Sequence, residues 1–445
     1  SVPMPVFLWK TPGDSSFFEG AAPVVFSGGC RCCGRNVQIT AFKLIYSETV
    51  PAEIVFFVTL RGYRFCRYCE NTAKRFRGSG NKLPVLEKTV NTKKQMEMEL
   101  KKSRNYQLDV LRVLACYLVI HQHASEFFYI GEGGTVVTGE NTFWVGIITS
   151  VARISVPLFV MISGYLLLPM QGTVSAFFRK RFTRILFPFV AWCVAYAFYR
   201  MFRNDGTWSG LLTDVLHIPV NFGVEVGHLW YIYMLMGLYL IVPVLSPWLS
   251  ACSKRELQGY LGLWGLTTLL PYVHLVFPAL LGECFWNPTP AFYYLNGFAG
   301  YLVLGFYLKK YGVPSVGLSL IFVLSGYAVT AAVFCSRIYT SAMVAELELS
   351  WGFCTANVAL LTLGVFALVM HCPDRKCGWL QDVSVKSYGM YLSHIMLLNL
   401  VYEQLASWLP DARVAVPVIA LVTFVCVYVL VKLLSYLPYS KYWLG

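Results

Sequence analysis

Long apolar segments recur along the chain from about residue 105 onward, and short polar stretches separate them. A helix of about 20 predominantly apolar residues crosses the hydrocarbon core of a bilayer. The pattern therefore predicts an all-α fold built from about ten transmembrane helices. The expected spans are 108–128, 143–169, 185–202, 226–249, 257–282, 288–309, 314–335, 349–371, 385–406 and 413–436.

Composition supports a polytopic membrane protein and excludes several other classes. Hydrophobic residues make up 57% of the chain and charged residues 13%, against roughly 25% charged residues in soluble domains. A soluble enzyme, a disordered chain and a secreted disulfide scaffold are excluded on this basis. We predict no nucleic-acid partner despite the formal charge of +13, because the basic residues are not gathered on one binding face. The lipid bilayer is the expected surrounding, and the sequence leaves the oligomeric state open.

Residues 1–95 differ from the rest of the chain. They carry 14 Lys and Arg against 6 Asp and Glu, and their best apolar run, 54–60, is too short to span a membrane. The stretch also lacks the n-region and h-region of a signal peptide. We expect it to be a disordered basic tail or an extension upstream of the true start, with the membrane domain at 96–445.

Cysteines cluster twice in this stretch, as CRCC at 30–33 and as CRYC at 66–69. The second cluster has the CxxC spacing of half a zinc site, but the spacing of the first suits a zinc ion poorly. We therefore predict no metal site. The nine later cysteines are mostly single and embedded in apolar runs, where a free cysteine behaves as a small hydrophobic side chain.

Basic residues mark alternate loops of the predicted topology. They are Lys101, Lys102, Arg104, Arg179, Lys180, Arg181, Arg184, Lys254, Arg255, Lys309, Lys310, Arg375, Lys376 and Lys441. The loop at 129–142 has no Lys or Arg and carries two Glu. Because Lys and Arg are enriched in cytoplasmic loops, we expect both termini in the cytoplasm.

The first predicted span carries Arg112 and His123, and an ionised side chain at bilayer depth costs about 2.5–3.5 kcal/mol to insert. Eleven residues turn a helix by about 1100°, so the two share one face about 16 Å apart, while His121 lies on the opposite side. Arg112 either snorkels from the cytoplasmic end or belongs to a site. His123 lies in the outer half of the span, where it is either functional or a packed, hydrogen-bonded histidine.

Further basic side chains follow in spans two and three. Arg153 lies about ten residues into its span, beyond easy snorkelling. Arg181 and Arg184 stand three residues apart and share one helical side. They either anchor the cytoplasmic end of the third span or bind phosphate, whose oxygens match the guanidinium fork.

Polar and aromatic residues also occupy spans four and nine. His228 and Trp230 open the fourth span near its outer surface, and Tyr391 and His394 stand three residues apart in the ninth. Such side chains inside a membrane are candidates for a binding site.

Taken in order, these residues resemble the motifs of the membrane acyltransferase-3 family over roughly 105–435. Arg112 and His123 resemble the Arg-x10-His signature of its first helix. The further matches are PLF at 157–159 with SGYL at 163–166, Arg181-x-x-Arg184, HLWY at 228–231 and SYGMYLSH at 387–394.

The resemblance implies an acyl-CoA-dependent O-acyltransferase of the cell's inner (cytoplasmic) membrane. It would move an acyl group, usually acetyl, from cytoplasmic acetyl-CoA to a hydroxyl of an envelope polysaccharide or lipid-linked sugar. By the same analogy, Arg112 and His123 belong to the catalytic centre, and Arg181 and Arg184 bind the CoA phosphates. We further predict that Arg153 is catalytic and that Ser163 helps to bind the CoA donor. The residues expected to bind the glycan acceptor are His228, Trp230 and His394.

In the mechanism we predict, neutral His123 accepts the proton of the sugar hydroxyl, and Arg153 or His228 stabilises the developing oxyanion. Arg112 orients the pantetheine arm or pairs with Asp109. An acyl-histidine relay is an alternative to direct transfer. A non-enzymatic transporter or flippase of a lipid-linked sugar, and an unrelated membrane acyltransferase with a His/Asn pair, are alternative functions.

Overall fold

The computed structural model describes two compact units, Ser1–Lys102 and Ser103–Gly445. The described residues are 24–30, 35–41, 104–203, 206–219, 227–277, 282–284, 287–290, 292 and 295–445. In the first unit, strands β1 (Val24–Cys30) and β2 (Arg35–Ala41) pair as an antiparallel hairpin. Most of the two cysteine clusters lies outside the described residues, so the predictions for the leader and for its lack of a metal stay predictions.

The second unit is helical almost throughout. Its α-helices are α3 (Tyr106–Glu126), α4 (Glu140–Thr149), α5 (Ser155–Leu167), α6 (Val174–Arg203), α7 (Trp208–His217), α9 (Trp230–Ala251), α10 (Lys254–Thr267), α11 (Leu270–Val276), α12 (Ala299–Tyr311), α13 (Val316–Arg337), α14 (Val344–Leu347), α15 (Ala356–His371), α16 (Gly378–Leu405) and α17 (Ala412–Leu434). The 3-10 helices are η2 (Glu132–Gly134), η3 (Ser150–Ile154), η4 (Gly227–Leu229), η6 (Glu348–Trp351) and η7 (Ser440–Tyr442). A small antiparallel hairpin joins β3 (Gly282–Cys284) to β4 (Asn287–Pro290).

Five stretches of the described chain are long and apolar enough to cross a membrane, and a bent pair of helices makes a sixth. The five are Glu140–Leu167, Val174–Arg203, Gly227–Ala251, Val316–Arg337 and Ala412–Leu434, and each coincides with a predicted span. The sixth joins Val344–Trp351 to Ala356–His371 with a bend of 43°. The multi-pass helical architecture is therefore confirmed. The count of ten spans and the cytoplasmic termini stay predictions.

The other four predicted spans differ from the observed helices for identifiable reasons. Helices α3 and α16 form where expected, with 21 and 28 residues, but they carry too many polar side chains to qualify by composition alone. The span expected at 257–282 divides into α10 and α11, and Pro271 stands in the first turn of α11, where it needs no hydrogen-bonded N–H. The span expected at 288–309 is represented among the described residues by α12, which begins at Ala299 and has 13 residues, about 20 Å of helix.

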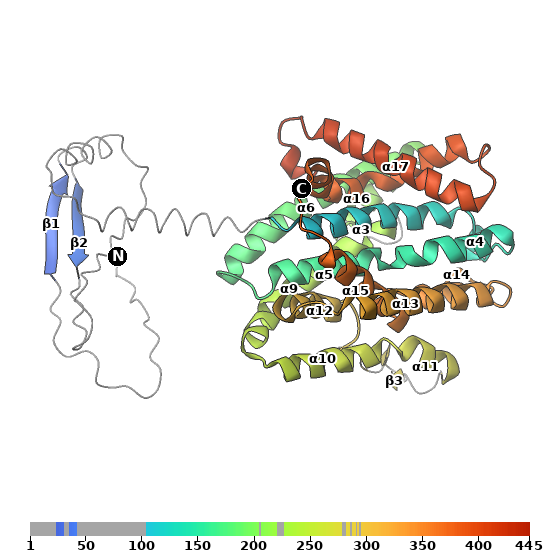
Figure 1. Cartoon of the computed structure of the whole chain (residues 1–445). Helices are drawn as coiled ribbons and strands as arrows, with labels where there is room; N and C mark the ends of the chain where they lie inside the picture. The colour runs from blue at the N-terminus through green and yellow to red at the C-terminus, as the bar shows by residue number, and fades with distance from the viewer. Residues whose placement is uncertain are drawn as a thin grey trace. The chain divides into compact units, whose positions relative to one another are not determined.

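The polar helix α3 lies inside the bundle, where it packs against α5, α16 and α17 (Figure 1). Helix α5 in turn crosses α12 at two glycines. A Cβ on Gly164 would lie 1.8 Å from the carbonyl oxygen of Leu302, and one on Gly305 would lie 2.1 Å from that of Met161. The backbones touch directly, as at the small-residue contacts of membrane helices.

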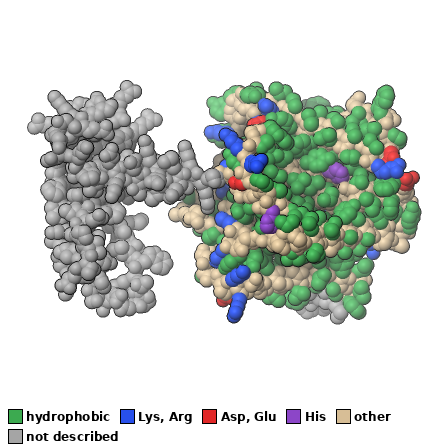
Figure 2. Space-filling view, in the orientation of Figure 1, with side chains coloured by type: hydrophobic (Ala, Val, Ile, Leu, Met, Phe, Trp, Pro, Cys, Tyr) green, Lys and Arg blue, Asp and Glu red, His purple; other side chains and the backbone are tan. Residues whose placement is uncertain are grey.

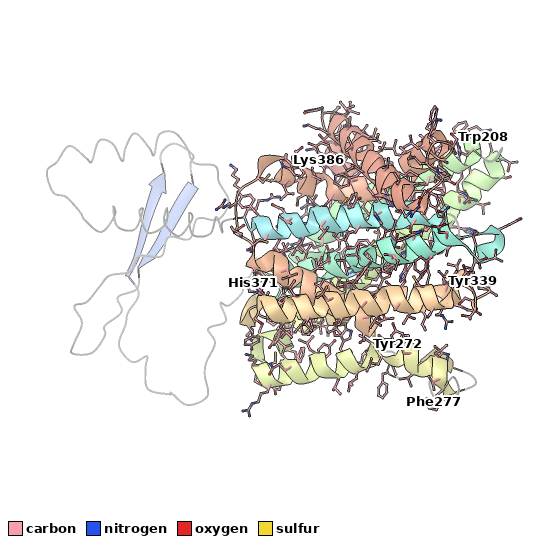
Figure 3. All side chains as sticks on the ribbon, turned by 45° about the vertical axis from the view of Figure 1, so that its right-hand side comes forward. Trp208, Tyr272, Phe277, Tyr339, His371 and Lys386 are labelled. Atoms are coloured by element: carbon pink, nitrogen blue, oxygen red, sulfur yellow. The ribbon has the colours of Figure 1, made fainter. Side chains whose placement is uncertain are left out.

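The outer surface of the helical unit is apolar between two polar ends. Figure 2 shows hydrophobic side chains over most of the visible face, with Lys and Arg toward the ends of the bundle. Trp208, Phe277 and Tyr339 lie at the end opposite His371 and Lys386 (Figure 3). Trp208 is 70% exposed and Tyr339 is 78% exposed, as expected of aromatic side chains at a membrane interface.

Candidate active site

Three histidines from separate parts of the chain meet inside the bundle. His123 comes from the last turn of α3, His228 from η4 and His394 from α16. The ring centroids of His123 and His394 are 5.3 Å apart, those of His228 and His394 5.0 Å, and those of His123 and His228 6.4 Å. His228 and His394 are buried, whereas His123 keeps 17% of its side chain exposed. The structure thus assembles the three histidines that the sequence singled out.

The hydrogen bonds around the cluster fix the ring of His394. Its Nδ1 lies 2.6 Å from the carbonyl oxygen of Tyr391. Since a carbonyl only accepts, Nδ1 carries the proton and Nε2 carries the lone pair. Within the described part of the chain, Nε2 of His394 and Nε2 of His228 have no hydrogen-bond partner. A buried nitrogen without a hydrogen-bond partner lowers the stability of the fold, so its presence calls for a functional explanation.

Tyrosines surround the cluster and tie its elements together. The hydroxyl of Tyr391 donates to the backbone carbonyl of His228, which joins α16 to η4. Tyr196 of α6 packs against His228 with ring centroids 5.0 Å apart, and its buried hydroxyl has no partner among the described residues. Sequence reasoning missed Tyr196. One aromatic residue in an apolar helix gives no signal until the packing places it beside a histidine.

Among the residues that the structure describes, no group of three or more His, Cys, Asp and Glu is arranged to hold a metal ion. Imidazole nitrogens can bind hydroxyls and transfer protons. His123 has one acidic neighbour, Glu126, whose Oε1 lies 2.9 Å from Nδ1 of His123.

Arg112 lies toward the other end of α3, in a network of its own. Its Nη1 lies 3.2 Å from Oδ1 of Asp109 and donates to Oγ of Ser384 over 3.0 Å. Asp109 is buried, and its Oδ2 also accepts a hydrogen bond from Nε of Arg104 over 2.6 Å. Ser384 Oγ donates to Oδ1 of Asp109 over 2.6 Å, so three residues satisfy the buried carboxylate, in agreement with the predicted pairing of Arg112 with Asp109. Along α3, Arg112 stays about 16 Å from His123.

Arg153 also makes a buried ion pair. Its Nη2 lies 2.9 Å from Oε1 of Glu348, and its guanidinium stacks 4.2 Å from the ring centroid of Trp351. Tyr129 donates to the same carboxylate oxygen over 2.5 Å. These contacts tie η3 to η6. The predicted oxyanion role of Arg153 stays a prediction, and its observed partners are those of a buried structural ion pair.

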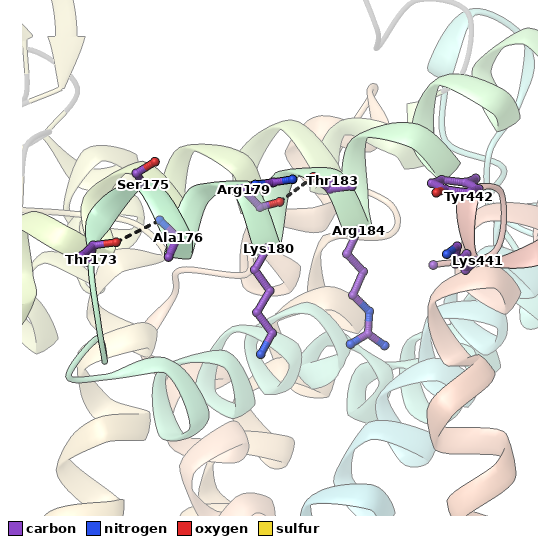
Figure 4. A pocket seen from close by; sticks show the side chains of 10 residues that line it. Thr173, Ser175, Ala176, Arg179, Lys180, Thr183, Arg184, Lys441 and Tyr442 are labelled. Atoms are coloured by element: carbon purple, nitrogen blue, oxygen red, sulfur yellow. Dashed lines mark hydrogen bonds between the residues drawn. The ribbon is translucent and has the colours of Figure 1, made fainter. Parts of the chain in front are cut away.

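A basic pocket opens at the end of the bundle where α3 begins. Its volume is about 860 Å³, and Figure 4 shows Lys180 and Arg184 extending from α6 in the same direction, with Lys441 across from them. The lining residues are Thr173, Ser175, Ala176, Arg179, Lys180, Thr183, Arg184, Lys441, Tyr442 and Gly445. Four cations and several hydroxyls make the pocket suited to a polyanion.

The two arginines that were predicted to bind phosphate have different surroundings in the structure. Arg184 lines the pocket, whereas Arg181 lies over the ring of Phe177, 5.9 Å from its centroid. Both arginines, together with Arg112, still lie close enough to Tyr239 of α9 to interact with it electrostatically.

Ser163 and Trp230 lie outside both polar sites. The hydroxyl of Ser163 donates to the carbonyl of Phe159 in its own helix over 2.9 Å. The ring of Trp230 stacks on Phe353 with centroids 5.6 Å apart and packs against Phe298. Their predicted roles in donor and acceptor binding stay predictions, because the hydrogen bond and ring contacts observed for them in the described chain do not involve the pocket or the histidines.

The fold and these sites define a class, a multi-pass membrane protein with a buried histidine cluster and a basic pocket at one end. The model of the acyltransferase-3 family, described as an acyltransferase domain, matches residues 105–436. The chain therefore belongs to the acyltransferase-3 family, as its motifs indicated. No curated protein and no solved structure matches it. Membership favours a membrane acyltransferase over the lipid-linked-sugar transporter.

Proposed function

We propose that this protein transfers an acetyl group from acetyl-CoA to a hydroxyl of a cell-envelope polysaccharide or lipid-linked sugar, and that it works in the cytoplasmic membrane. The cluster of His123, His228 and His394 is the observation that carries the proposal. Acyl transfer to a hydroxyl needs a neutral base with a free lone pair at the reacting oxygen. The unpaired Nε2 atoms of His228 and His394 supply acceptors for neighbouring sugar hydroxyls.

The basic pocket supports a phosphorylated donor. The cations of Arg179, Lys180, Arg184 and Lys441 suit the phosphates of CoA. The thioester then passes from the pocket into the bundle, toward the histidines. The donor approaches from the basic end and the acceptor from the end where α3 finishes, so the two substrates meet at the histidines.

The reaction we propose is direct transfer. Nε2 of His123 takes the proton of the sugar hydroxyl while the oxygen attacks the thioester carbonyl carbon. The carbon–sulfur bond then breaks, and the CoA thiolate takes the proton from the imidazolium. The step balances with an ester and free CoA as products. Tyr196, whose ring packs against His228, lies close enough to the cluster to donate its hydroxyl to the oxyanion.

Acyl transfer in isolated membranes tests the proposal. Acetyl-CoA labelled in its acetyl group is supplied with envelope glycans, and base-labile label in the glycan is counted for wild type, His123→Ala and His121→Ala at equal amounts of folded protein. His121 is a matched control, because it is a buried histidine of the same helix on the opposite face. We expect His123→Ala to lower labelling by about 10²–10⁴-fold, the usual worth of a general base, and His121→Ala to retain it.

Two results would contradict the proposal in different ways. Equal labelling by wild type and His123→Ala would reject His123 as the base and leave an acetyl-CoA-dependent enzyme. Absence of glycan label with wild type, in membranes that contain the folded protein, would reject the assignment of acetyl-CoA as donor or of the envelope glycan as acceptor.

A further inference from the structure

We infer that Glu126 is the positioning residue of the catalytic base, and that its carboxylate is what distinguishes His123 from the other two histidines of the cluster. The inference rests on the proposed function. Glu126 is the last residue of α3 and stands one turn beyond His123, where side chains three residues apart share a helical face. Its Oε1 lies 2.9 Å from Nδ1 of His123.

The chemistry of the pair follows from this contact. A carboxylate oxygen attracts an N–H and repels a lone pair, so we infer that Nδ1 of His123, 2.9 Å away, carries the proton and Nε2 carries the lone pair. The carboxylate holds the ring in that tautomer and stabilises the imidazolium that forms when Nε2 takes the hydroxyl proton. Glu126 thus orients His123 and supplies a negative charge without contacting the reacting atoms.

The other two histidines have no equivalent partner among the described residues. The Nδ1 of His394 faces a neutral backbone carbonyl, that of Tyr391, which fixes a tautomer but adds no negative charge. His228 contacts the aromatic rings of Tyr196 and Tyr391. Of the three rings, His123 alone has a side-chain carboxylate within hydrogen-bonding distance in this part of the chain. The structure therefore assigns the base to His123 and the hydroxyl-binding role to the other two.

The end of α3 is held firmly enough to position the carboxylate. Phe127 follows Glu126 and stacks on Tyr402 of α16 with ring centroids 3.8 Å apart and an interplanar angle of 9°. The backbone carbonyl of Glu126 accepts the N–H of Ile130 over 3.2 Å. Because α16 also carries His394, the same helix fixes both the cluster and the end of α3.

Purified full-length protein in detergent provides the test, with Glu126→Gln, Glu126→Asp and a control, Glu132→Gln. Gln keeps the size of the side chain and loses the charge, whereas Asp keeps the charge and shortens the side chain. Glu132 is an exposed acid six residues further along whose side chain makes no contact with the cluster. The turnover number kcat and the KM of each substrate are measured for the fraction that elutes as folded protein.

We expect Glu126→Gln to lower kcat by about 10²-fold, the scale of a misplaced catalytic group, with both KM values within about twofold because no substrate contact is removed. Glu126→Asp is expected to retain more activity than Glu126→Gln, and Glu132→Gln to match wild type. A Gln variant as active as wild type, or more active than the Asp variant, would overturn the inference, since a packing role favours the residue of equal size. Inactive wild type would instead count against the proposed function.

Discussion

The histidine cluster and the basic pocket are polar regions of one helical unit, and they differ in burial and in how their polar atoms are paired. The cluster is enclosed, with two imidazole nitrogens left unpaired by the described residues. The pocket is open, and its cations come from exposed positions on α6 and the C-terminal segment. Buried unpaired acceptors suit precise contact with a reacting hydroxyl, whereas exposed cations suit long-range capture of a polyanion.

This difference predicts different kinetic consequences. Groups of the cluster act on the transition state, so their loss lowers kcat, or kcat/KM for the acceptor. Groups of the pocket hold a part of the donor that does not react, so their loss raises the donor KM. A third polar region, the ion pair of Arg153 and Glu348, is buried like the cluster but its charges are matched. Substituting a residue of this pair tests whether burial by itself identifies a catalytic group.

Outside His123, the largest effect is expected from Arg153→Met, and it is an effect on stability. The change leaves Glu348 without its cation and costs about 3 kcal/mol, the lower range for a broken buried pair because Glu348 is partly exposed. A fall in melting temperature in detergent measures it. The matched control is Arg413→Met, which breaks the exposed pair with Asp411 and costs about 0–1 kcal/mol. Lost activity at an unchanged melting temperature would instead favour the oxyanion role of Arg153.

The next effect is expected from His394→Leu, on acceptor use. Losing a buried hydrogen-bond acceptor costs about 1–3 kcal/mol, so we expect kcat/KM for the glycan to fall by about 30-fold with the donor KM unchanged. Steady-state kinetics with the glycan varied at saturating donor measure this. His274→Leu, at an exposed position on α11, serves as the control. A rise in the donor KM alone would show that His394 belongs to the donor side.

The smallest effect is expected from Arg184→Ala, on donor binding. One charge-assisted contact at an exposed site contributes about 1.4 kcal/mol, so the KM for acetyl-CoA should rise about tenfold while kcat at saturation stays constant. Arg181→Ala is the comparison, and we expect a smaller rise because Arg181 lies over Phe177 outside the pocket. If both substitutions raised the KM for acetyl-CoA equally, both arginines would belong to the donor site.

Much of the fold could be predicted from hydrophobic runs, because a span must be apolar over a length set by the bilayer. The span expected at 108–128 forms as α3, although its polar side chains are shielded by other helices and not by lipid. Helix α3 is polar on the face that carries Arg112 and His123 and still lies inside the bundle. The apolar stretch at 288–309 is long enough to span a membrane, but most of the described residues in its first half are not helical.

The sequence by itself determined which residue types the site contains. An ionisable side chain inside an apolar segment is costly, so Arg112, His123, Arg153, His228 and His394 stand out without any structure. Only the tertiary structure decided how these residues are grouped. Helix packing brought the three histidines together, paired Arg153 with Glu348, and separated Arg184 from Arg181. Local periodicity places a side chain on a face of its own helix, but which helices pack against that face depends on contacts between residues up to hundreds of positions apart.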